Sequence, residues 1–265
     1  AVSAEDAAAH ADLVFLATPV GGLRDMLARM LPHLRDATLL TDGGSTKAEV
    51  VDAARLALGA RIGSAADNAT PLRLVIGYTP GGAVDAVARM LVDSLRTSLG
   101  RPVLLEHRVG AGQRVALNEI RRTAPDGNTL FIGTLSPFTI YPNIIRKLDY
   151  DPVNDFSPVA RLATFDACLA TGPATGAATI QQLVAWARAN LKKAAYGTPG
   201  NGTQPHFAGF ALGQAMGVPL MHIPYRGGNL AMTDLIGGQI PMMISSLPDM
   251  LEMHRVGKLR IVALT

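Results

Sequence analysis

Two glycine loops offer the clearest chemistry in the sequence. The first reads Y-T-P-G-G (78–82) and the second, about 120 residues later, reads Y-G-T-P-G-N-G (196–202). Each follows a short apolar run and opens a segment with helical spacing. Glycine lets the backbone approach a ligand closely, and the N–H groups at a helix start favour an anion. The pair predicts that two loops bind one small acid between them. Gly-Gly before a helix is also a common loop sequence without a binding role.

The candidate ligand-binding residues come from these loops and from two neutral hydrogen-bonding side chains elsewhere. They are Thr79, Gly81, Gly82, Ala83, Ser136, Gly200, Asn201, Gly202, Thr203 and Tyr225. Backbone N–H groups would bind the acid, so we expect no catalytic residue here. His206 lies in the first turn of the helix after the second loop, where a contact with an anion and a structural role are both open.

The motifs for cofactors and metals are incomplete. G-A-G (110–112) begins like a dinucleotide fingerprint, but Val115 stands where the third glycine belongs. The six histidines are scattered without metal-ligand spacing, and the single cysteine, Cys168, lies in an apolar stretch. We therefore expect no cofactor, no metal site and no intrachain disulfide.

These loops belong to a repeating pattern of strand, glycine loop and helix. An apolar strand is predicted over 72–76 and a helix over 83–99, and the alternation returns with a strand over 194–197 and a helix over 203–216. Helix crossovers between short buried strands indicate parallel sheets with helices on both faces. The predicted fold class is α/β.

A small polar stretch over 64–71 divides the chain as a linker. Before it, residues 1–63 read as strand, helix, strand and helix, which is a partial Rossmann-like βαβα fragment. After it, residues 72–265 hold the two glycine loops, which we expect on separate lobes at roughly 72–160 and 161–265.

The composition excludes several classes of protein. Hydrophobic residues make up 48% and charged residues 17%, which rules out global disorder. The net charge is +3 without a basic stripe, so we expect no nucleic-acid partner. No apolar run approaches the ~18 residues of a membrane span, so we expect no direct membrane insertion. Residues 1–9 show no signal-peptide pattern.

Several segments between 71 and 265 carry a family resemblance. They are P-G-G-A-V-D (80–85), V-G-A-G (109–112), A-P-D-G-N-T-L (124–130), Y-D-P-V-N-D-F-S-P-V (150–159), Y-G-T-P-G-N-G-T (196–203) and H-I-P-Y-R-G-G-N-L-A-M-T-D-L-I-G-G-Q-I (222–240). In these the chain resembles the substrate-binding proteins of tripartite tricarboxylate transporters, the Bug family. The resemblance implies two periplasmic-binding-protein-like lobes that close on a small carboxylate or related metabolite, as a Venus flytrap does.

The chain departs from the family pattern in three places, one of which is Ser245-Ser246 where the family has an asparagine after the strand at 240–244. The family usually continues G-A-G-G-N-I-G, whereas here Gly112 is followed by Q-R-V-A (113–116). Arg114 could add a cation to the cleft or be solvated, and both interpretations stay open. The chain also stops at Thr265, where the family goes on to complete its first lobe, so we expect a C-terminally incomplete domain.

The first part of the chain carries a second resemblance. A-D-L-V-F-L-A-T-P-V (11–20), P-H-L (32–34) and T-D-G-G-S-T-K (41–47) are similar to the middle of a prephenate dehydrogenase nucleotide-binding domain. The Gly-rich turn that binds pyrophosphate and the stretch with the family's catalytic histidine are both missing. We therefore expect this fragment to be a passenger without activity.

The sequence thus predicts a solute-binding protein, not an enzyme. The Bug resemblance implies a periplasmic location and a membrane permease as partner, and we expect a monomer. A real fusion without a signal peptide would instead be cytoplasmic. An NAD-dependent prephenate dehydrogenase-like enzyme and a non-functional fusion are the alternatives. The ligand stays open among amino acids, dicarboxylates, aromatic acids and amides.

Overall fold

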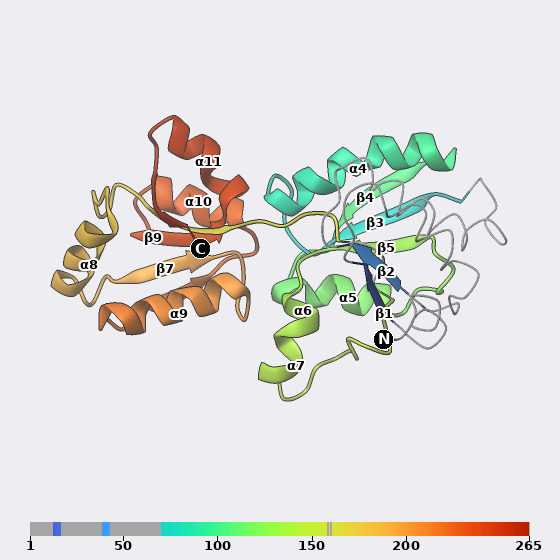
Figure 1. Ribbon diagram of the computed structural model, residues 1–265, viewed down its shortest axis with the longest axis horizontal. Coiled ribbons are helices and arrows are strands. Elements are labelled where there is room, and N and C mark those ends of the chain that lie inside the picture. Colours follow the sequence, from blue (N-terminus) through green and yellow to red (C-terminus); the bar gives the residue numbers. More distant parts are fainter. Residues whose placement is uncertain (1–12, 17–38, 43–69, 158, 160, 265) are drawn as a thin grey trace.

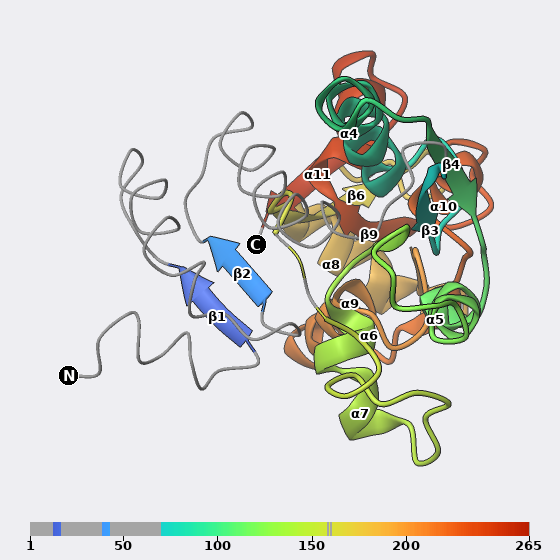
Figure 2. The same ribbon diagram turned by 90° about the vertical axis from the view of Figure 1, so that its right-hand side faces the viewer.

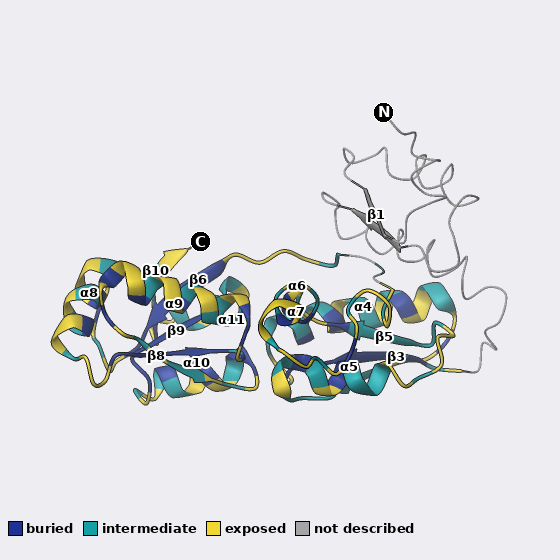
Figure 3. Ribbon diagram, turned by 90° about the horizontal axis from the view of Figure 1, so that it is seen from below, coloured by how far each residue is buried: buried dark blue, intermediate teal, exposed yellow. Residues whose placement is uncertain are grey.

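The computed structural model describes residues 13–16, 39–42, 70–157, 159 and 161–264. From residue 70 onward they form two α/β lobes that lie side by side along the long axis of the molecule (Figure 1). The two-lobed α/β class expected from the sequence is confirmed. In both lobes the central strands are the most buried elements, and the outer faces of the helices are exposed (Figure 3).

The first lobe is built on a three-stranded parallel sheet in the order β4-β3-β5. Its strands are β3 (Leu72–Ile76), β4 (Val103–His107) and β5 (Thr129–Ile132). Helix α4 (Ala83–Leu99) covers one face of the sheet, while α5 (Arg114–Ile120) covers the other (Figures 1 and 2). Burial of β3 between two helix layers explains why its residues are apolar except for the partly buried Arg73.

Helix α4 has clear sequence signals at both ends. Asp85 lies in its first turn, where the positive end of the helix dipole favours a carboxylate. Gly100 ends it in a left-handed conformation with φ of 64°, which glycine adopts without a Cβ clash. Ala88 and Leu95 face the core together with β3, so the helix is fixed against the strand that leads to the first glycine loop.

The second lobe has a five-stranded sheet in the order β10-β6-β9-β7-β8. The strands are β6 (Ala167–Thr171), β7 (Ala195–Thr198), β8 (Met221–Pro224), β9 (Met242–Ser246) and β10 (Arg260–Leu264). The helices are α8 (Ile180–Ala189), α9 (Gln204–Met216), α10 (Gly228–Ile236) and α11 (Leu247–Arg255). Cys168 lies buried in β6, as the apolar stretch predicted.

The second sheet departs from the expected parallel arrangement at one strand, β6. Strand β6 runs antiparallel to both β9 and β10, whereas β7 pairs in parallel with β8 and β9. Strands β7, β8 and β9 follow one another through crossover helices α9 and α10, which keep them parallel. A fully buried strand is an apolar run in either direction, so the sequence pattern could not show that β6 is reversed.

Two short helices in the first lobe were not predicted from the sequence. They are α6 (Ser136–Thr139) and α7 (Tyr141–Ile144), each with a proline in its first turn. Single helical turns leave almost no periodic signal in the sequence. They matter because α7 carries Tyr141 to the boundary with the second lobe.

Of the amino-terminal segment, the structure describes only two short strands. Strands β1 (Leu13–Leu16) and β2 (Leu39–Asp42) pair in parallel, as a βαβ unit requires. The helices expected between and after them, and residues 64–69 of the expected linker, lie outside the described residues. Within the described part of the chain, no helix has both the length and the apolar character to cross a membrane.

Candidate functional site

A cavity of about 250 Å³ lies at the boundary between the two lobes. Its walls are the segments that follow strands β3, β4, β7 and β8, together with two residues at α7: residues 77–78, 109–114, 199–201 and 224–226, with Tyr141 and Ile145. Ligands of open α/β sheets bind at the carboxyl ends of the strands, which is where this cavity lies.

The first-lobe wall of the cavity is a tight turn after β4. Ala111, Gly112 and Gln113 have φ values of 47°, 61° and 76°, all in the left-handed region. A Cβ on Gly112 would lie 2.0 Å from the hydroxyl oxygen of Tyr141, so glycine is required there on two grounds. The turn therefore presents bare backbone to the cavity.

The buried side chain of Gln113 connects this turn to Thr134, which follows strand β5. This side chain is fully buried, its Nε2 donates to Thr134 Oγ1 at 2.7 Å, and its Oε1 accepts from the Thr134 N–H at 3.0 Å. The Thr134 hydroxyl also lies 3.2 Å from the hydroxyl of Tyr78. Burial raises the pKa of Tyr78, so the floor of the cavity stays neutral and polar.

The second-lobe wall is held by hydroxyl groups behind it. Thr198 Oγ1 and Thr203 Oγ1 both donate to the carbonyl oxygen of Gly200, at 3.1 and 2.8 Å. The Tyr141 hydroxyl donates to the carbonyl oxygen of Asn201 at 3.0 Å and so crosses from one lobe to the other. With these carbonyls engaged, the loop is fixed on the cavity side.

The two walls leave backbone donors free. Within the described residues, the N–H groups of Ala111, Gly112, Gly200 and Asn201 carry no hydrogen bond. Gly200 is buried and Gly112 is half-buried, whereas Ala111 and Asn201 are exposed, so these donors are open to water or to a ligand. An acceptor with several oxygen atoms, such as a carboxylate, fits this set.

The charge at the cavity is positive. Arg114 and Arg226 contribute to its lining, and no Asp or Glu is among the described residues that line it. Arg114 is partly engaged, because its Nε donates to the carbonyl of Ala111 at 3.2 Å and its Nη1 lies 3.6 Å from Asp149. Arg226 is exposed and makes no side-chain hydrogen bond or ion pair within the described residues. An anion is therefore favoured.

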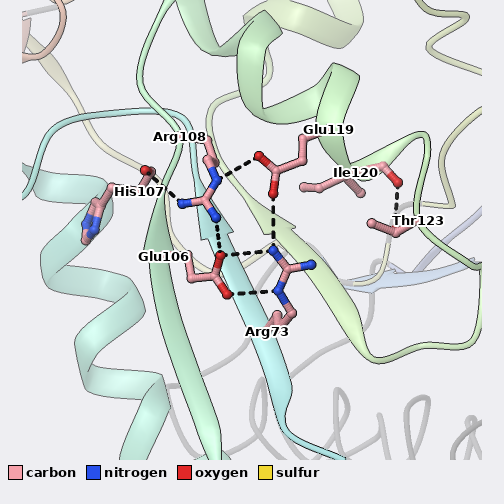
Figure 4. Close-up of polar contacts among 7 residues, drawn as sticks. All are labelled: Arg73, Glu106, His107, Arg108, Glu119, Ile120 and Thr123. Carbon is pink, nitrogen blue, oxygen red and sulfur yellow. Dashed lines mark hydrogen bonds and ion pairs between the residues drawn. The ribbon is translucent and has the colours of Figure 1, made fainter.

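An ion-pair network holds the base of the first wall. Arg73 binds Glu106 through two hydrogen bonds of 2.8 and 2.9 Å and reaches Glu119 on α5 at 3.1 Å (Figure 4). Arg108 contacts the same two carboxylates, each at 2.7 Å. The Arg73 guanidinium lowers the pKa of Glu106. The network ties β3, β4 and α5 together directly before residue 109, where the lining begins.

A stacked histidine pair supports the second wall. The rings of His206 and His222 are 3.8 Å apart, and His222 Nε2 lies 2.7 Å from Thr198 Oγ1. His206 Nδ1 accepts from the Gly202 N–H at 3.1 Å. Burial, and to a smaller extent His206, lowers the pKa of His222 to about 4. His206 therefore has a structural contact and does not line the cavity.

The predicted site residues divide into three groups. Gly200, Asn201 and Tyr225 line the cavity. Gly202 and Thr203 lie behind it and shape the second loop, while Ser136 is buried at the start of α6. The expectation that the first glycine loop faces the same cavity needs correction, because Thr79, Gly81, Gly82 and Ala83 do not line it.

The physical reason is that the first loop binds protein carboxylates. The Gly81 N–H donates to Asp85 at 2.9 Å, and the Ala83 N–H donates to Asp249 of the second lobe at 2.8 Å. The cavity wall is instead the turn at 110–113, whose glycines looked like an incomplete dinucleotide motif. The sequence signal that could have found it is this same G-A-G after a strand, since strand ends place such turns at a ligand site.

Two α/β lobes with a polar, positively charged cavity at their boundary are the arrangement of proteins that close around a small ligand. The model of the family described as tripartite tricarboxylate transporter family receptor matches residues 87–265, and the chain belongs to this family. The prephenate dehydrogenase nucleotide-binding domain matches residues 2–66, about a quarter of the chain.

Individual relatives agree with this assignment. BugT of Bordetella pertussis is 30% identical over 74% of this chain and 60% of its own, and the UPF0065 protein in the gbd 5' region of Cupriavidus necator is 35% identical over 73% and 58%. Among solved structures, Rpa4515 of R. palustris with adipate has a TM-score of 0.70 at 26% identity, and MatC of Rhodopseudomonas palustris with bound malate has 0.68 at 25%. This chain covers 66% of each of these two structures, at 74% and 73% of its own length.

The chain spans about 60% of the length of BugT and of the UPF0065 protein of Cupriavidus necator.

Proposed function

We propose that this protein captures a small organic acid in the cavity between its lobes and delivers it to a membrane permease of the tripartite tricarboxylate type. The observation that carries the proposal is the pairing of two walls with free backbone N–H groups, at 111–112 and 200–201, across one cavity. Donors on both lobes can bind the carboxylate oxygens of one ligand, so the bound acid favours the closed state.

The charge of the cavity narrows the ligand class. Arg114 and Arg226 can pair with carboxylates, whereas an amino acid's ammonium group would find no carboxylate among the described lining residues. The expected ligand is therefore an organic acid without a charged amine. The bound malate and adipate of the two solved relatives are acids of this kind.

The wider setting follows from the relatives. BugD, a solved relative with 29% identity, is titled a periplasmic binding protein. We propose the same location for this protein, a membrane permease as its partner, and a monomeric state. We further propose that residues 1–63 form a separate dehydrogenase-like unit, joined by a linker over 64–71 to the lobes at 72–160 and 161–265. The match of residues 2–66 to the nucleotide-binding domain supports that division.

A thermal-shift screen tests the proposal. A ligand that binds only the folded state raises the melting temperature by mass action. At a ligand concentration of 100 times Kd the free energy of unfolding rises by about 2.7 kcal/mol. Malate, adipate and an aromatic acid at millimolar concentration are the positive set, and glutamate tests the exclusion of an ammonium group. A flat response to every acid, or a response to glutamate alone, would contradict the proposal.

The same screen addresses the dehydrogenase alternative. The match of residues 2–66 favours it as a second candidate. Residues 2–66 match the domain without containing a Gly-rich turn of the kind that binds pyrophosphate, so we expect no stabilisation of these 265 residues by NADH. Micromolar affinity for NADH would favour the enzyme over the binding protein.

A further inference from the structure

Hydrogen bonds join the two lobes beside the cavity, at the first glycine loop. The Thr79 hydroxyl donates to Asn229 Oδ1 at 2.7 Å, and Asn229 Nδ2 donates to the carbonyl of Pro80 at 2.9 Å. Asn229 lies on α10 of the second lobe, so its single amide uses both ends to hold the loop at 79–80. Neither end of that amide contributes to the cavity lining.

The carboxylate of Asp249 makes a second connection a short distance along the loop. Its Oδ1 accepts the Ala83 N–H at 2.8 Å, and its Oδ2 accepts hydroxyl hydrogens from Ser245 at 2.5 Å and Ser246 at 2.9 Å. The two serines fix the orientation of the carboxylate from within the second lobe. A Cβ on Gly228 would lie 2.5 Å from Asp249 Oδ2, so glycine leaves the room that this carboxylate fills.

The position that Asp249 occupies is an anion position. Ala83 is the first residue of α4, a helix of 17 residues, and its N–H lies at the positive end of the helix without a partner inside the helix. A carboxylate from the opposite lobe satisfies that N–H, where a ligand's carboxylate was expected from the sequence. Asp249 also lies in the first turn of its own helix, α11, so one carboxylate faces the amino ends of helices from both lobes.

We infer that Asp249 and Asn229 form an interlobe latch, and that they are positioning residues which hold the lobes closed over the cavity. They act on the lobes and not on the ligand, because neither lines the cavity. The latch makes the closed state well populated before any ligand enters. The consequence for ligand affinity rests on the proposed function, whereas the effect on the lobes does not.

The latch predicts a specific change in binding. The apparent Kd equals the intrinsic Kd divided by the fraction of protein in the competent state. If the loss of the latch lowers the closed fraction about tenfold, the apparent Kd rises about tenfold. Entry of ligand needs an open cleft, so association becomes faster in the same variants while dissociation becomes faster still. A mere loss of stability would not speed association.

The direct test measures the distance between the lobes without ligand. Nitroxide labels on Asp93→Cys in α4 and Gln214→Cys in α9, both exposed in the native chain, report the separation by pulsed electron resonance. The natural Cys168 is buried and its thiol pKa is raised to about 12 by that burial, so it stays unlabelled. The variants are Asp249→Ala and Asn229→Ala, and the matched control on α11 is Glu252→Ala, an exposed residue paired with Arg255.

The expected result is one narrow distance in the unliganded parent and in the control, with a broader and altered distribution in both latch variants. Circular dichroism melts identify a variant that fails to fold, and the second variant, on a different helix, then decides. Unchanged distributions in folded latch variants would overturn the inference, as would an unliganded parent that is already broad.

Titration with adipate separates the two proposals. Altered distances in the latch variants without adipate or malate binding in any protein would support the latch and contradict the proposed function. Binding of adipate with the same Kd and the same association rate in all variants would support the function and overturn the latch.

Discussion

At the scale of single residues, Arg226 is the side chain whose role depends most on a ligand. It is exposed, lies at the cavity and has no partner within the described residues. A surface cation without a partner contributes little to stability, so its removal leaves the fold unchanged. We expect Arg226 to contribute to binding free energy only when an anion is bound, through a charge-assisted hydrogen bond.

Arg226→Gln is expected to weaken binding of adipate about 10- to 100-fold, from a loss of about 1.5–3 kcal/mol for a hydrogen bond to a charged group. The melting temperature of the unliganded protein should not change. Isothermal titration measures the first quantity, and Arg96→Gln, an exposed arginine on α4, is the matched control. Equal affinities for Arg226→Gln and the control would show that Arg226 does not contact the ligand.

The stacked pair of His206 and His222 couples the second wall to pH. The folded-state pKa of His222 is lowered to about 4 from an unfolded value near 6.5. Between these values the unfolded chain binds a proton that the folded protein does not, so stability falls as the pH falls. The stabilising contribution is complete above about pH 6.5 and is lost progressively towards pH 4.

His222→Gln should therefore flatten the decline of stability between pH 6.5 and pH 4. Glutamine can still donate to Thr198 Oγ1, so the loop keeps its contact. Urea unfolding at pH 7 and pH 5 gives the two free energies for each protein. The control is Gln214→Ala on α9, an exposed residue without a titratable group, which should keep the parent slope. A parent slope retained in His222→Gln would assign the pH dependence to other groups.

At the scale of elements, the turn at 110–113 decides the shape of the cavity. Three successive residues with left-handed backbone hold it open, and Tyr141 packs against it from α7. The same ring lies against Gly202, where a Cβ would be 2.9 Å from Tyr141 Cε1. Glycines from both lobes thus let one tyrosine bridge the walls.

Gly112→Ala is expected to displace this turn and weaken adipate binding at least tenfold. The matched control is Gly176→Ala, because Gly176 has φ of 62° against 61° for Gly112 but no atom within 4 Å of its Cβ position. Both variants bear the left-handed strain of about 1–3 kcal/mol, and only Gly112→Ala adds a clash. Equal adipate affinity and equal melting temperatures in the two variants would show that the Tyr141 contact is unimportant.

Most elements of the two lobes were predictable because their signals are local. Leu72–Ile76 is an apolar strand apart from Arg73, and α4 has helical spacing between Asp85 and Gly100. The direction of β6 and the short helix of Tyr141 were not predictable, since neither leaves a periodic pattern.

The candidate site was predicted only in part, because a carboxylate of the protein can occupy the backbone N–H groups that a ligand would use. A glycine loop before a helix shows that an anion is favoured there, but not which anion. At Ala83 the anion is Asp249, some 160 residues later in the sequence, and this pairing exists only in the folded protein. Among the described residues no carboxylate binds the N–H groups of Gly200 and Asn201, and both residues line the cavity, so their contact with a ligand stays a prediction.

At the scale of the whole molecule, the proposed binding depends on two lobes that meet at one cavity. The first lobe supplies the turn at 110–113 and Tyr141, and the second supplies the loop at 199–201 with Arg226. A ligand held by both lobes shifts the population towards the closed form by its differential affinity for that form.

Isothermal titration of the intact protein with adipate, malate, glutamate and NADH tests the central claim most directly. We predict saturable 1:1 binding of at least one of the two dicarboxylic acids, with no heat from glutamate or NADH. Heat from NADH at micromolar concentration, with none from either dicarboxylic acid, would contradict it.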